Sequence, residues 1–549
     1  MFYFIGAVCA KLAENYIMKP KIFAVAFLFS LQLFASHTWA QKLSFYDFRP
    51  LRDSIQTSRA ITSFNISTDR DFYLLLSPAA SLQSELAKLT PELKPDELFT
   101  KGNYSFDFLV DGLKVYSENL HPGAILLEDK LTKRPLDIAL ISNNRSGLWS
   151  INLWERFMSK SGYRLLGKQP KVLEIQIRTY IDHNGLRYGE VLNQAKLSVT
   201  RIPKTIDPQT MLPEPIAAGS GFELSKANLD QRLIIELNTK IAEQTYRKIN
   251  GIVVLKKGEL LLEQYYNKEN RESLHDPRSV SKSITSTLTG MAIKDGYISS
   301  ENQVLKEFYN LHQYAAYSEK KDSVKLVDLL SMSAAFEGND EVDTSLGNEE
   351  NMYPTADYTK FTLDLPMSAT RENGKSWAYF TAGTNLVMDI LDKRIPGGIE
   401  AYAQSKLFAP LGIEKFEWAR TPQGKPFGGG GLKLRALDFA KYGQLYLDNG
   451  VFKGKRILEK SWVKKSLSPL QVLPADRPGF YGLLFWNKTF LVNGKNHEVY
   501  YCSGNGGNKI YIFKDLPIVV VITSSAYGTA FGHLQADEIV EKYLLPSLL

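Results

Sequence analysis

The chain has 549 residues, which is long for one domain, so two folded domains are the natural expectation. Its composition, 44% hydrophobic and 23% charged, is that of a globular protein and excludes a disordered chain. The net charge of +7 is spread over short basic runs with acidic neighbours, and no basic stripe with interleaved aromatic residues stands out, so nucleic-acid binding is disfavoured.

The N-terminus has the pattern of an export signal. Two lysines precede an apolar run at residues 22–33, and small residues suit cleavage after Ala40. The run is too short for a comfortable membrane span. We therefore expect residues 1–40 to be removed from a periplasmic or secreted protein that keeps no membrane span; Met18 is an alternative start of translation.

Cysteine usage excludes a disulfide within the mature chain. Cys9 precedes the expected cleavage site, so only Cys502 remains after it. Cys502 lies in a strand-like stretch, and we interpret it as a small side chain packed in a core.

Residues 41–205 predict a mostly β accessory domain, an antiparallel, sandwich-like fold. The turn pairs Asp111-Gly112 and Asn184-Gly185 separate strand candidates. No nucleophile lies beside a base in this region, so we do not expect it to catalyse. The strand candidates are residues 72–76, 104–110, 172–177 and 195–199, with helical insertions near residues 82–89 and 154–158.

A proline-rich linker, residues 206–224, leads into a second domain at residues 225–549. Helical spacing at one end and strand patterns at both ends predict one antiparallel sheet built from the two ends of this domain, with a helical region inserted between them. The whole chain is therefore expected to be α+β. The expected elements are a helix at residues 228–246, a hairpin at 251–255 and 260–266, strands at 498–502, 509–513 and 518–522, and a terminal helix at 534–545.

Ser279 and Lys282 are the strongest candidates for chemistry. They open a strongly helical stretch at residues 279–295, and a spacing of three places both side chains on one face of a helix. A serine hydroxyl needs a neighbouring base, and a lysine amine can be that base when its surroundings lower its pKa. Spacing alone favours a simpler interpretation, a helix cap followed by a solvated lysine.

Further segments follow this pair in a recognisable order, and together they resemble the superfamily of serine β-lactamases and penicillin-binding proteins over about residues 228–549. The resemblance is to class C β-lactamases, D,D-peptidases, related esterases and nylon-oligomer hydrolases. It implies a β-lactamase-like sheet flanked by helices, and it needs no cofactor. The matching segments are residues 251–258, 278–286, 327–333, 429–443 and 503–507.

The family's second motif, Tyr-x-Asn, reads Tyr379-Phe380-Thr381 here. The resemblance implies that Tyr379 takes the serine proton as a phenolate or relays it to the leaving group, with a pKa depressed by Lys282. Thr381 replaces the amide residue. Tyr379 alone is also typical of an aromatic residue in a strand.

The third motif, Lys-Thr-Gly in penicillin-recognising members, departs more. The segment 503–507 reads Ser-Gly-Asn-Gly-Gly, with no lysine before Gly504, and either Cys502-Ser503-Gly504 or Gly504-Asn505-Gly506 could align with the motif. The resemblance implies that Ser279 and the stretch of Gly504, Asn505 and Gly506 supply backbone N–H groups to the oxyanion. A glycine-rich bulge between strands is the alternative interpretation. The missing cation favours neutral esters or amides over penicillins, unless Arg278 or Lys509 replaces it.

Other chemistries are disfavoured. Gly428 to Gly431 lacks the Gly-Lys-Ser/Thr of a phosphate loop and predicts a tight turn before a helix. The histidines show no metal-like pairing, and no Gly-x-Ser-x-Gly elbow surrounds Ser279. His275 is expected at the rim of the site at most.

The leading hypothesis is a serine hydrolase that acts through an acyl-enzyme on a small ester or amide, or on a peptidoglycan-like substrate. A D,D-peptidase or a β-lactamase is the alternative within this class. A catalytically inactive module that binds peptidoglycan or a partner is the alternative from another class, and the altered third motif keeps it open.

Overall fold

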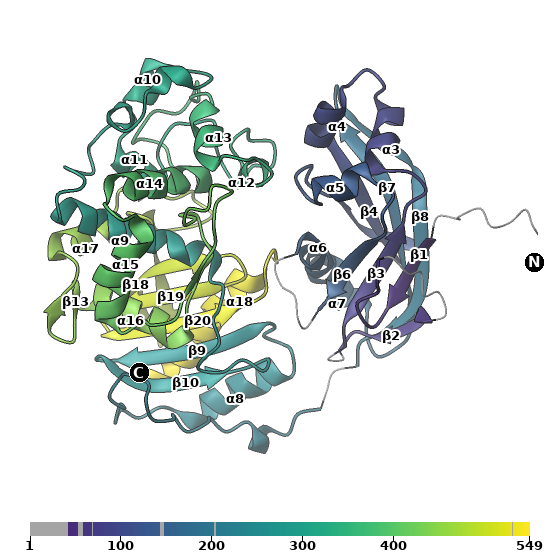
Figure 1. Ribbon diagram of the computed structural model, residues 1–549. Coiled ribbons are helices and arrows are strands. Elements are labelled where there is room, and N and C mark those ends of the chain that lie inside the picture. Colours follow the sequence, from purple (N-terminus) through teal and green to yellow (C-terminus); the bar gives the residue numbers. More distant parts are fainter. Residues whose placement is uncertain (1–41, 53–58, 68–69, 143–147, 203–204, 530) are drawn as a thin grey trace, which may run out of the picture.

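The computed structural model describes residues 42–549 except 53–58, 68–69, 143–147, 203–204 and 530 (Figure 1). The expected signal segment, residues 1–40, lies outside the described residues. In the described part of the chain, no helix has the length and hydropathy that a bilayer span requires.

The C-terminal region is built on one antiparallel sheet of eight strands in the order β10-β9-β20-β19-β18-β17-β16-β15. The first hairpin of the region therefore pairs with its last strand, as the sequence predicts, with Val253 opposite Val521. The bounds are β9 Ile249–Lys256, β10 Glu259–Tyr265, β15 Gln471–Val472, β16 Phe480–Tyr481, β17 Trp486–Val492, β18 Lys495–Gly504, β19 Asn508–Phe513 and β20 Ile518–Ser524.

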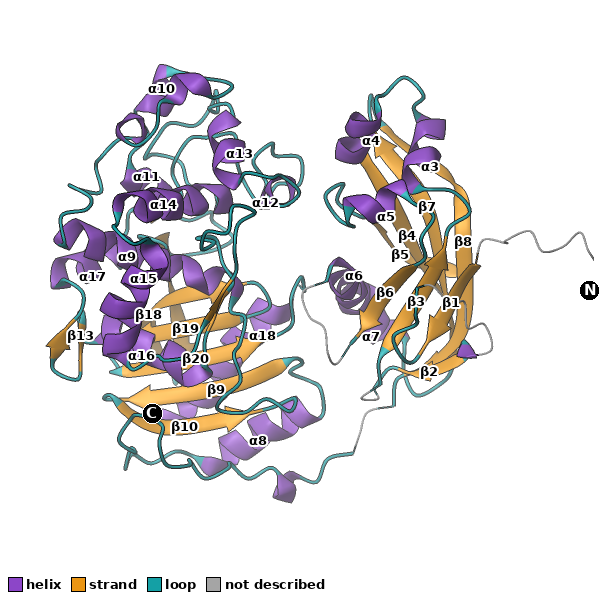
Figure 2. Ribbon diagram, viewed as in Figure 1, coloured by secondary structure: helices purple, strands orange, loops and turns teal. Residues whose placement is uncertain are grey.

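Helices cover both faces of this sheet, and its central strands are buried throughout. Helix α16 packs on β9, β19 and β20, while α18 contacts β19 and α8 contacts the C-terminal helical segment. Helices α10 to α14 gather beyond the sheet, at the top of the view (Figure 2). The bounds are α8 Gln231–Ala242, α9 Ser281–Lys294, α10 Glu319–Asp322, α11 Leu326–Leu330, α12 Glu349–Met352, α13 Tyr358–Asp364, α14 Thr381–Arg394, α15 Ile399–Ala403, α16 Ala436–Leu447, α17 Lys460–Ser466, α18 Phe531–Ile539 and α19 Leu545–Leu548.

Helix α9 lies at the centre of the region, and twelve of its fourteen residues are buried. Many of these residues are Ser or Thr, whose hydroxyls need partners inside a core. Ser283 donates to the Leu484 carbonyl at 2.6 Å, and Thr285 donates to the Gly428 carbonyl at 3.1 Å. These bonds fix the helix against two loops.

The N-terminal region is rich in strands, as predicted. It has a five-stranded sheet, β2-β8-β7-β4-β5, and a three-stranded sheet, β1-β3-β6. Trp154 lies within 5.4 Å of Phe72 of one sheet and 6.4 Å of Phe108 of the other, measured between ring centroids, so one core serves both. The bounds are β1 Lys42–Tyr46, β2 Ser63–Asn65, β3 Phe72–Ser77, β4 Gly102–Val110, β5 Leu113–Asn119, β6 Leu136–Ile141, β7 Lys171–Asp182, β8 Leu186–Thr200, α3 Leu82–Leu89, α4 Pro95–Lys101, α5 Leu127–Leu131, α6 Trp149–Phe157 and α7 Tyr163–Leu165.

Three details differ from expectation. Strand β2 runs parallel to β8, so the sandwich is not wholly antiparallel. Helix α6 begins at Trp149, five residues earlier than expected, and its buried face already starts with Ser150 and Ile151. Helix α8 is shorter than residues 228–246, since Asp230 caps its start and the left-handed Gln244 (φ 63°) ends it.

The N-terminal region touches the C-terminal region at the loop after β20 and at helix α12. Gly528 lies so close to Asn152 and Arg156 of α6 that an added Cβ would approach both within 3.0 Å. An added Cβ at Gly123 would likewise lie 2.7 Å from the Glu350 carbonyl oxygen.

Candidate active site

Ser279 lies in a one-turn 3-10 helix, Arg278–Val280, that runs directly into α9. The residue before it, Arg278, has φ 53°, a left-handed conformation that is strained for a side chain of this size. This sharp entry leaves Ser279 half-buried at the start of an otherwise buried helix. Strain at such a point is typical of a functional residue.

Lys282 is only 2% exposed, and its ammonium position is defined by two contacts. Nζ lies 2.7 Å from Ser279 Oγ and donates to the Gly429 carbonyl at 2.6 Å. The simpler interpretation, a solvated lysine after a helix cap, is therefore wrong. An amine held beside a hydroxyl in a dry environment has the arrangement of a base and its nucleophile.

Tyr379 closes the other side of Lys282, whose Nζ lies 5.0 Å from the ring centroid. The ring stacks on Trp486 at 5.9 Å. Burial raises the pKa of Tyr379, and the charge of Lys282 and a hydrogen bond with Ser279 oppose this rise without reversing it. The expected depressed pKa is therefore wrong, and Tyr379 carries its proton as a neutral phenol.

Asp340 is the residue of this site that the sequence reading missed. Its N–H donates to the Tyr379 carbonyl at 2.8 Å, and its Oδ2 accepts the Thr381 N–H at 2.7 Å. Its Oδ1 accepts the Glu349 N–H at 2.8 Å. Burial, with Glu349 adding to it, raises the pKa of Asp340 to about 7. Since Asp340 stands in an acidic loop with no motif, only its position in space reveals it.

Gly504 ends strand β18 directly against the nucleophile. A Cβ there would lie 1.8 Å from the Pro277 carbonyl oxygen and 3.1 Å from Ser279 N. Pairing of β18 with β17 stops at Tyr501, whereas pairing with β19 continues to Gly504. The last residues of β18 thus present a free backbone edge toward Ser279, which suits an oxyanion site.

Asn505 and Gly506 form the turn that follows. The Asn505 side chain is turned toward Gly528, whose N–H it accepts at 2.7 Å. Gly506 has φ 87°, and a Cβ there would come 2.9 Å from the Tyr527 ring. These two residues shape the turn, and Gly504 makes the contact with the nucleophile.

The two substitute cations are placed differently. Lys509 donates to Ser503 Oγ at 2.8 Å, on the face opposite Cys502 and Gly504 because side chains alternate along a strand. It is buried, which lowers its pKa to about 8, and it cannot replace the missing lysine. Arg278 lies over the Tyr527 ring at 4.4 Å, beside the nucleophile.

The remaining candidate residues are Cys502, His275 and the glycine turn at residues 428–431. Cys502 is fully buried, as expected of a packed side chain. His275, expected to be a rim contact at most, is 4% exposed and therefore buried away from the solvent-facing rim. The glycine turn at Gly428 to Gly431 belongs to the site as well, because its Gly429 carbonyl accepts a hydrogen bond from Lys282. Among the described residues, no group of three or more His, Cys, Asp or Glu is arranged to hold a metal ion.

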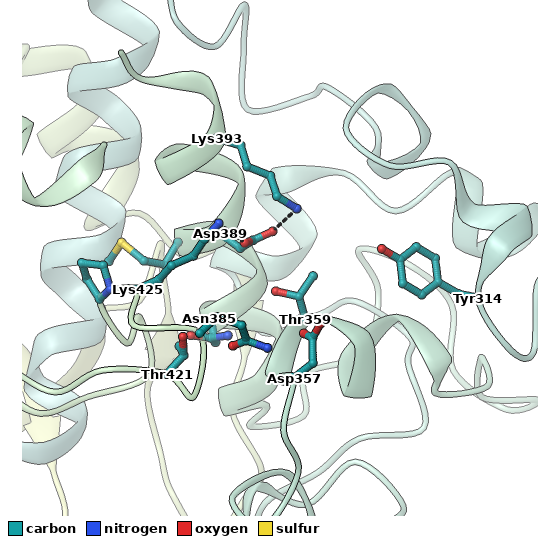
Figure 3. A pocket seen from close by; sticks show the side chains of 11 residues that line it. Tyr314, Asp357, Thr359, Asn385, Asp389, Lys393, Thr421 and Lys425 are labelled. Atoms are coloured by element: carbon teal, nitrogen blue, oxygen red, sulfur yellow. Dashed lines mark hydrogen bonds and ion pairs between the residues drawn. The ribbon is translucent and has the colours of Figure 1, made fainter. Parts of the chain in front are cut away.

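A separate cavity of about 220 Å³ lies beside α14 and contains none of these residues (Figure 3). Its lining holds two acidic residues, Asp357 and Asp389, and two lysines, and Asp389 is paired with Lys393 at 2.6 Å and Lys425 at 3.0 Å. Its polar lining is therefore largely neutralised internally, and the geometry of Ser279 and Lys282 remains the better guide to chemistry.

Comparison with known proteins agrees with this geometry. A family model described as beta-lactamase matches residues 239–544, more than half of the chain. The chain belongs to the beta-lactamase family. The matched residues contain all eight strands of the large sheet and leave out only the start of α8 and the helix α19 of this region's flanking helices. They include Ser279, Lys282, Tyr379 and Gly504.

Three individual relatives of this chain share only 14% to 26% of their residues with it. The 6-aminohexanoate-dimer hydrolase of Paenarthrobacter ureafaciens is 26% identical over 297 residues, which cover 51% of this chain and 68% of that protein. An octameric penicillin-binding protein homologue from Pyrococcus abyssi is 17% identical, with a TM-score of 0.45, over 57% of this chain and 77% of that one. A D-stereospecific amidohydrolase from Streptomyces is 14% identical, with a TM-score of 0.42, over 53% and 94%.

Proposed function

We propose that this beta-lactamase-family chain is a serine hydrolase that cleaves amide or ester bonds through an acyl-enzyme on Ser279. The observation that carries the proposal is the 2.7 Å approach of Lys282 Nζ to Ser279 Oγ in a site where the lysine is almost fully buried. A buried amine next to a hydroxyl is costly to fold and is explained by catalysis.

The reaction begins when Ser279 Oγ attacks the substrate carbonyl carbon and its proton passes to the Lys282 amine. The carbonyl oxygen becomes an oxyanion, which the Ser279 N–H and the free edge at Gly504 stabilise. Breaking the C–N or C–O bond releases the leaving group, which takes a proton from Lys282 through the neutral phenol of Tyr379. Water then attacks the acyl carbon while the same groups take up its proton. The bond to Ser279 Oγ breaks, Oγ regains the proton, and the carboxylic acid leaves.

Neutral esters or amides with short acyl groups are the proposed substrates. The end of β18 at Cys502 to Gly504 carries no lysine, and Lys509 of the neighbouring β19 faces away from Ser279. Arg278 lies beside the nucleophile, but its charge is paired with Asp276 at 3.5 Å. The relative from Paenarthrobacter ureafaciens is, by its name, a hydrolase of a 6-aminohexanoate dimer, which supports an amide substrate. A peptidoglycan-like substrate, and thus a D,D-peptidase, stays within the same mechanism.

The test is covalent labelling with a fluorophosphonate, followed by peptide mapping and turnover of nitrophenyl acetate. We expect the label on Ser279, and we expect Ser279→Ala to abolish turnover while its melting temperature is unchanged. Absence of label and of turnover in the wild type would favour the inactive binding module. Hydrolysis by Ser279→Ala at the wild-type rate would exclude the mechanism.

We also propose that the protein is exported to the periplasm or secreted. The apolar run at residues 22–33 and the cleavage pattern after Ala40 support this. N-terminal sequencing of the exported protein should begin at Gln41, and a start at Met1 or Met18 would contradict it.

A further inference from the structure

Asp340 connects the loop before α12 to the segment that carries Tyr379. Its backbone N–H and its carboxylate bracket this segment, because they bond the Tyr379 carbonyl and the Thr381 N–H on the two sides of Phe380. The same carboxylate accepts the Glu349 N–H. Asp340 therefore ties both Tyr379 and Thr381 to this loop, the first through its backbone and the second through its carboxylate.

The carboxylate also serves as a cap for α14. This helix begins at Thr381, and its N-cap residue, Phe380, has no side chain able to accept a hydrogen bond. The first N–H groups of a helix favour an anion, and the bond from the Thr381 N–H favours the ionised form of Asp340, although burial and Glu349 outweigh it and raise the pKa of Asp340. A cap drawn from 41 residues away couples the loop to the helix.

The charged groups around Asp340 are those of the active site. Lys282 on α9 attracts its negative charge, and Glu349 repels it. The charge of Asp340 raises the pKa of both Tyr379 and Tyr353. Tyr353 also donates a hydrogen bond to Glu349 at 2.8 Å. Burial holds the pKa of Asp340 at about 7, so the carboxyl titrates within the working range of an enzyme.

We propose that Asp340 is a positioning residue, whose ionised carboxylate holds the segment 379–381 against Ser279 and Lys282. It does not touch the substrate. This inference rests on the proposed serine-hydrolase function, and it adds a residue whose loss should lower kcat and leave KM little changed.

The full-length protein is tested at pH 8 with nitrophenyl acetate, after fluorophosphonate labelling has verified the active wild type. Asp340→Asn should lower kcat at least tenfold and change KM less than threefold. Asp357→Asn is the matched control, because Asp357 caps α13 through the Lys360 N–H at 2.9 Å away from the catalytic groups. It should change kcat less than twofold.

A second variant removes the same hydrogen bond from its donor side. Thr381→Pro deletes one N–H at the first position of a helix, where proline is tolerated, and Phe380 already has the extended conformation that proline requires before it (φ −141°). Thr381→Pro should lower kcat, and Asp340→Asn should then have a smaller effect in that background. Fully multiplicative effects would overturn the pairing.

The pH dependence of the melting temperature tests the Asp340 carboxyl itself, because a residue that acts elsewhere in the structure would not change it. A carboxyl whose pKa is raised on folding contributes stability that is lost as pH rises through its folded pKa. The melting temperature of Asp340→Asn relative to wild type should therefore increase between pH 5 and pH 8. A kcat for Asp340→Asn within twofold of wild type would overturn the proposal, whereas an inactive, unlabelled wild type would overturn the proposed function.

Discussion

Gly504→Ala tests whether the end of β18 forms part of the oxyanion site. The new Cβ would lie 1.8 Å from the Pro277 carbonyl oxygen, whereas Cβ atoms essentially never approach another heavy atom within 3.0 Å. The strand and the backbone at Pro277 must therefore separate by about 1.2 Å, and the neighbouring Ser279 N moves with Pro277. Displacement of catalytic groups by about 1 Å costs roughly 100-fold in rate.

We expect kcat for nitrophenyl acetate to fall about 100-fold in Gly504→Ala, which corresponds to about 2.7 kcal/mol of transition-state stabilisation. The matched control is Gly167→Ala, since a Cβ at Gly167 meets nothing within 4 Å. Both variants are compared by kcat and by melting temperature. A folded Gly504→Ala enzyme with kcat within threefold of wild type would show that the free edge of β18 does not bind the oxyanion.

The remaining predictions use the same assay. Lys282→Arg should be nearly as inactive as Lys282→Ala, because a guanidinium does not deprotonate in the working range; substantial activity would make the lysine a purely electrostatic group. The specificity constant should be higher for a nitrophenyl ester than for a chromogenic cephalosporin, since a carboxylate bound without a cation loses roughly ten- to a hundredfold in affinity; the opposite order would indicate a β-lactamase. A chain starting at Gly221 should still hydrolyse a small ester, but with a raised KM because α6 no longer packs on Gly528. An unchanged KM would show that residues 41–205 take no part in substrate binding.

Local patterns predicted much of the fold. Alternating apolar residues and turn pairs located β3, β4, β7 and β8 of the N-terminal region, because these signals depend on neighbours in the sequence, but they did not locate β1, β2, β5, β6 or β15 to β17. The expected hairpin corresponds to β9 and β10, and the three expected late strands correspond to β18, β19 and β20. Helix ends were less accurate, since Asp230 and Gln244, which set the ends of α8, act through backbone geometry that apolar spacing does not report.

Site residues with a recognisable spacing could be found, and those defined only in space could not. Ser279 and Lys282 are three residues apart on one helix, so their approach follows from helix geometry. Asp340 reaches Tyr379 across a loop, and the Gly429 carbonyl reaches Lys282 across 147 residues. No local pattern marks such contacts, because a carbonyl carries no side-chain signal at all.

The pKa of Tyr379 illustrates a different difficulty. The sequence places a cation beside a phenol, and charge attraction alone predicts a depressed pKa. In the structure, burial against Trp486 and other aromatic residues outweighs that attraction. Desolvation depends on the complete surroundings of a group, so its balance against a single charge emerges only when the walls of the site are known. A neutral phenol suits the proton relay that we propose for Tyr379.

The order of strands in the sheet explains why the site exists only in the complete C-terminal region. Ser279 follows the first hairpin, whereas Gly504 ends a strand near the other end of the chain. Pairing of β9 with β20 brings these ends together, and β19 then sets β18 beside the nucleophile turn. Such long-range pairing forms late because its loop-closure entropy must be overcome first. The end of β18 therefore lies beside Ser279 only when the last strands have joined the first hairpin.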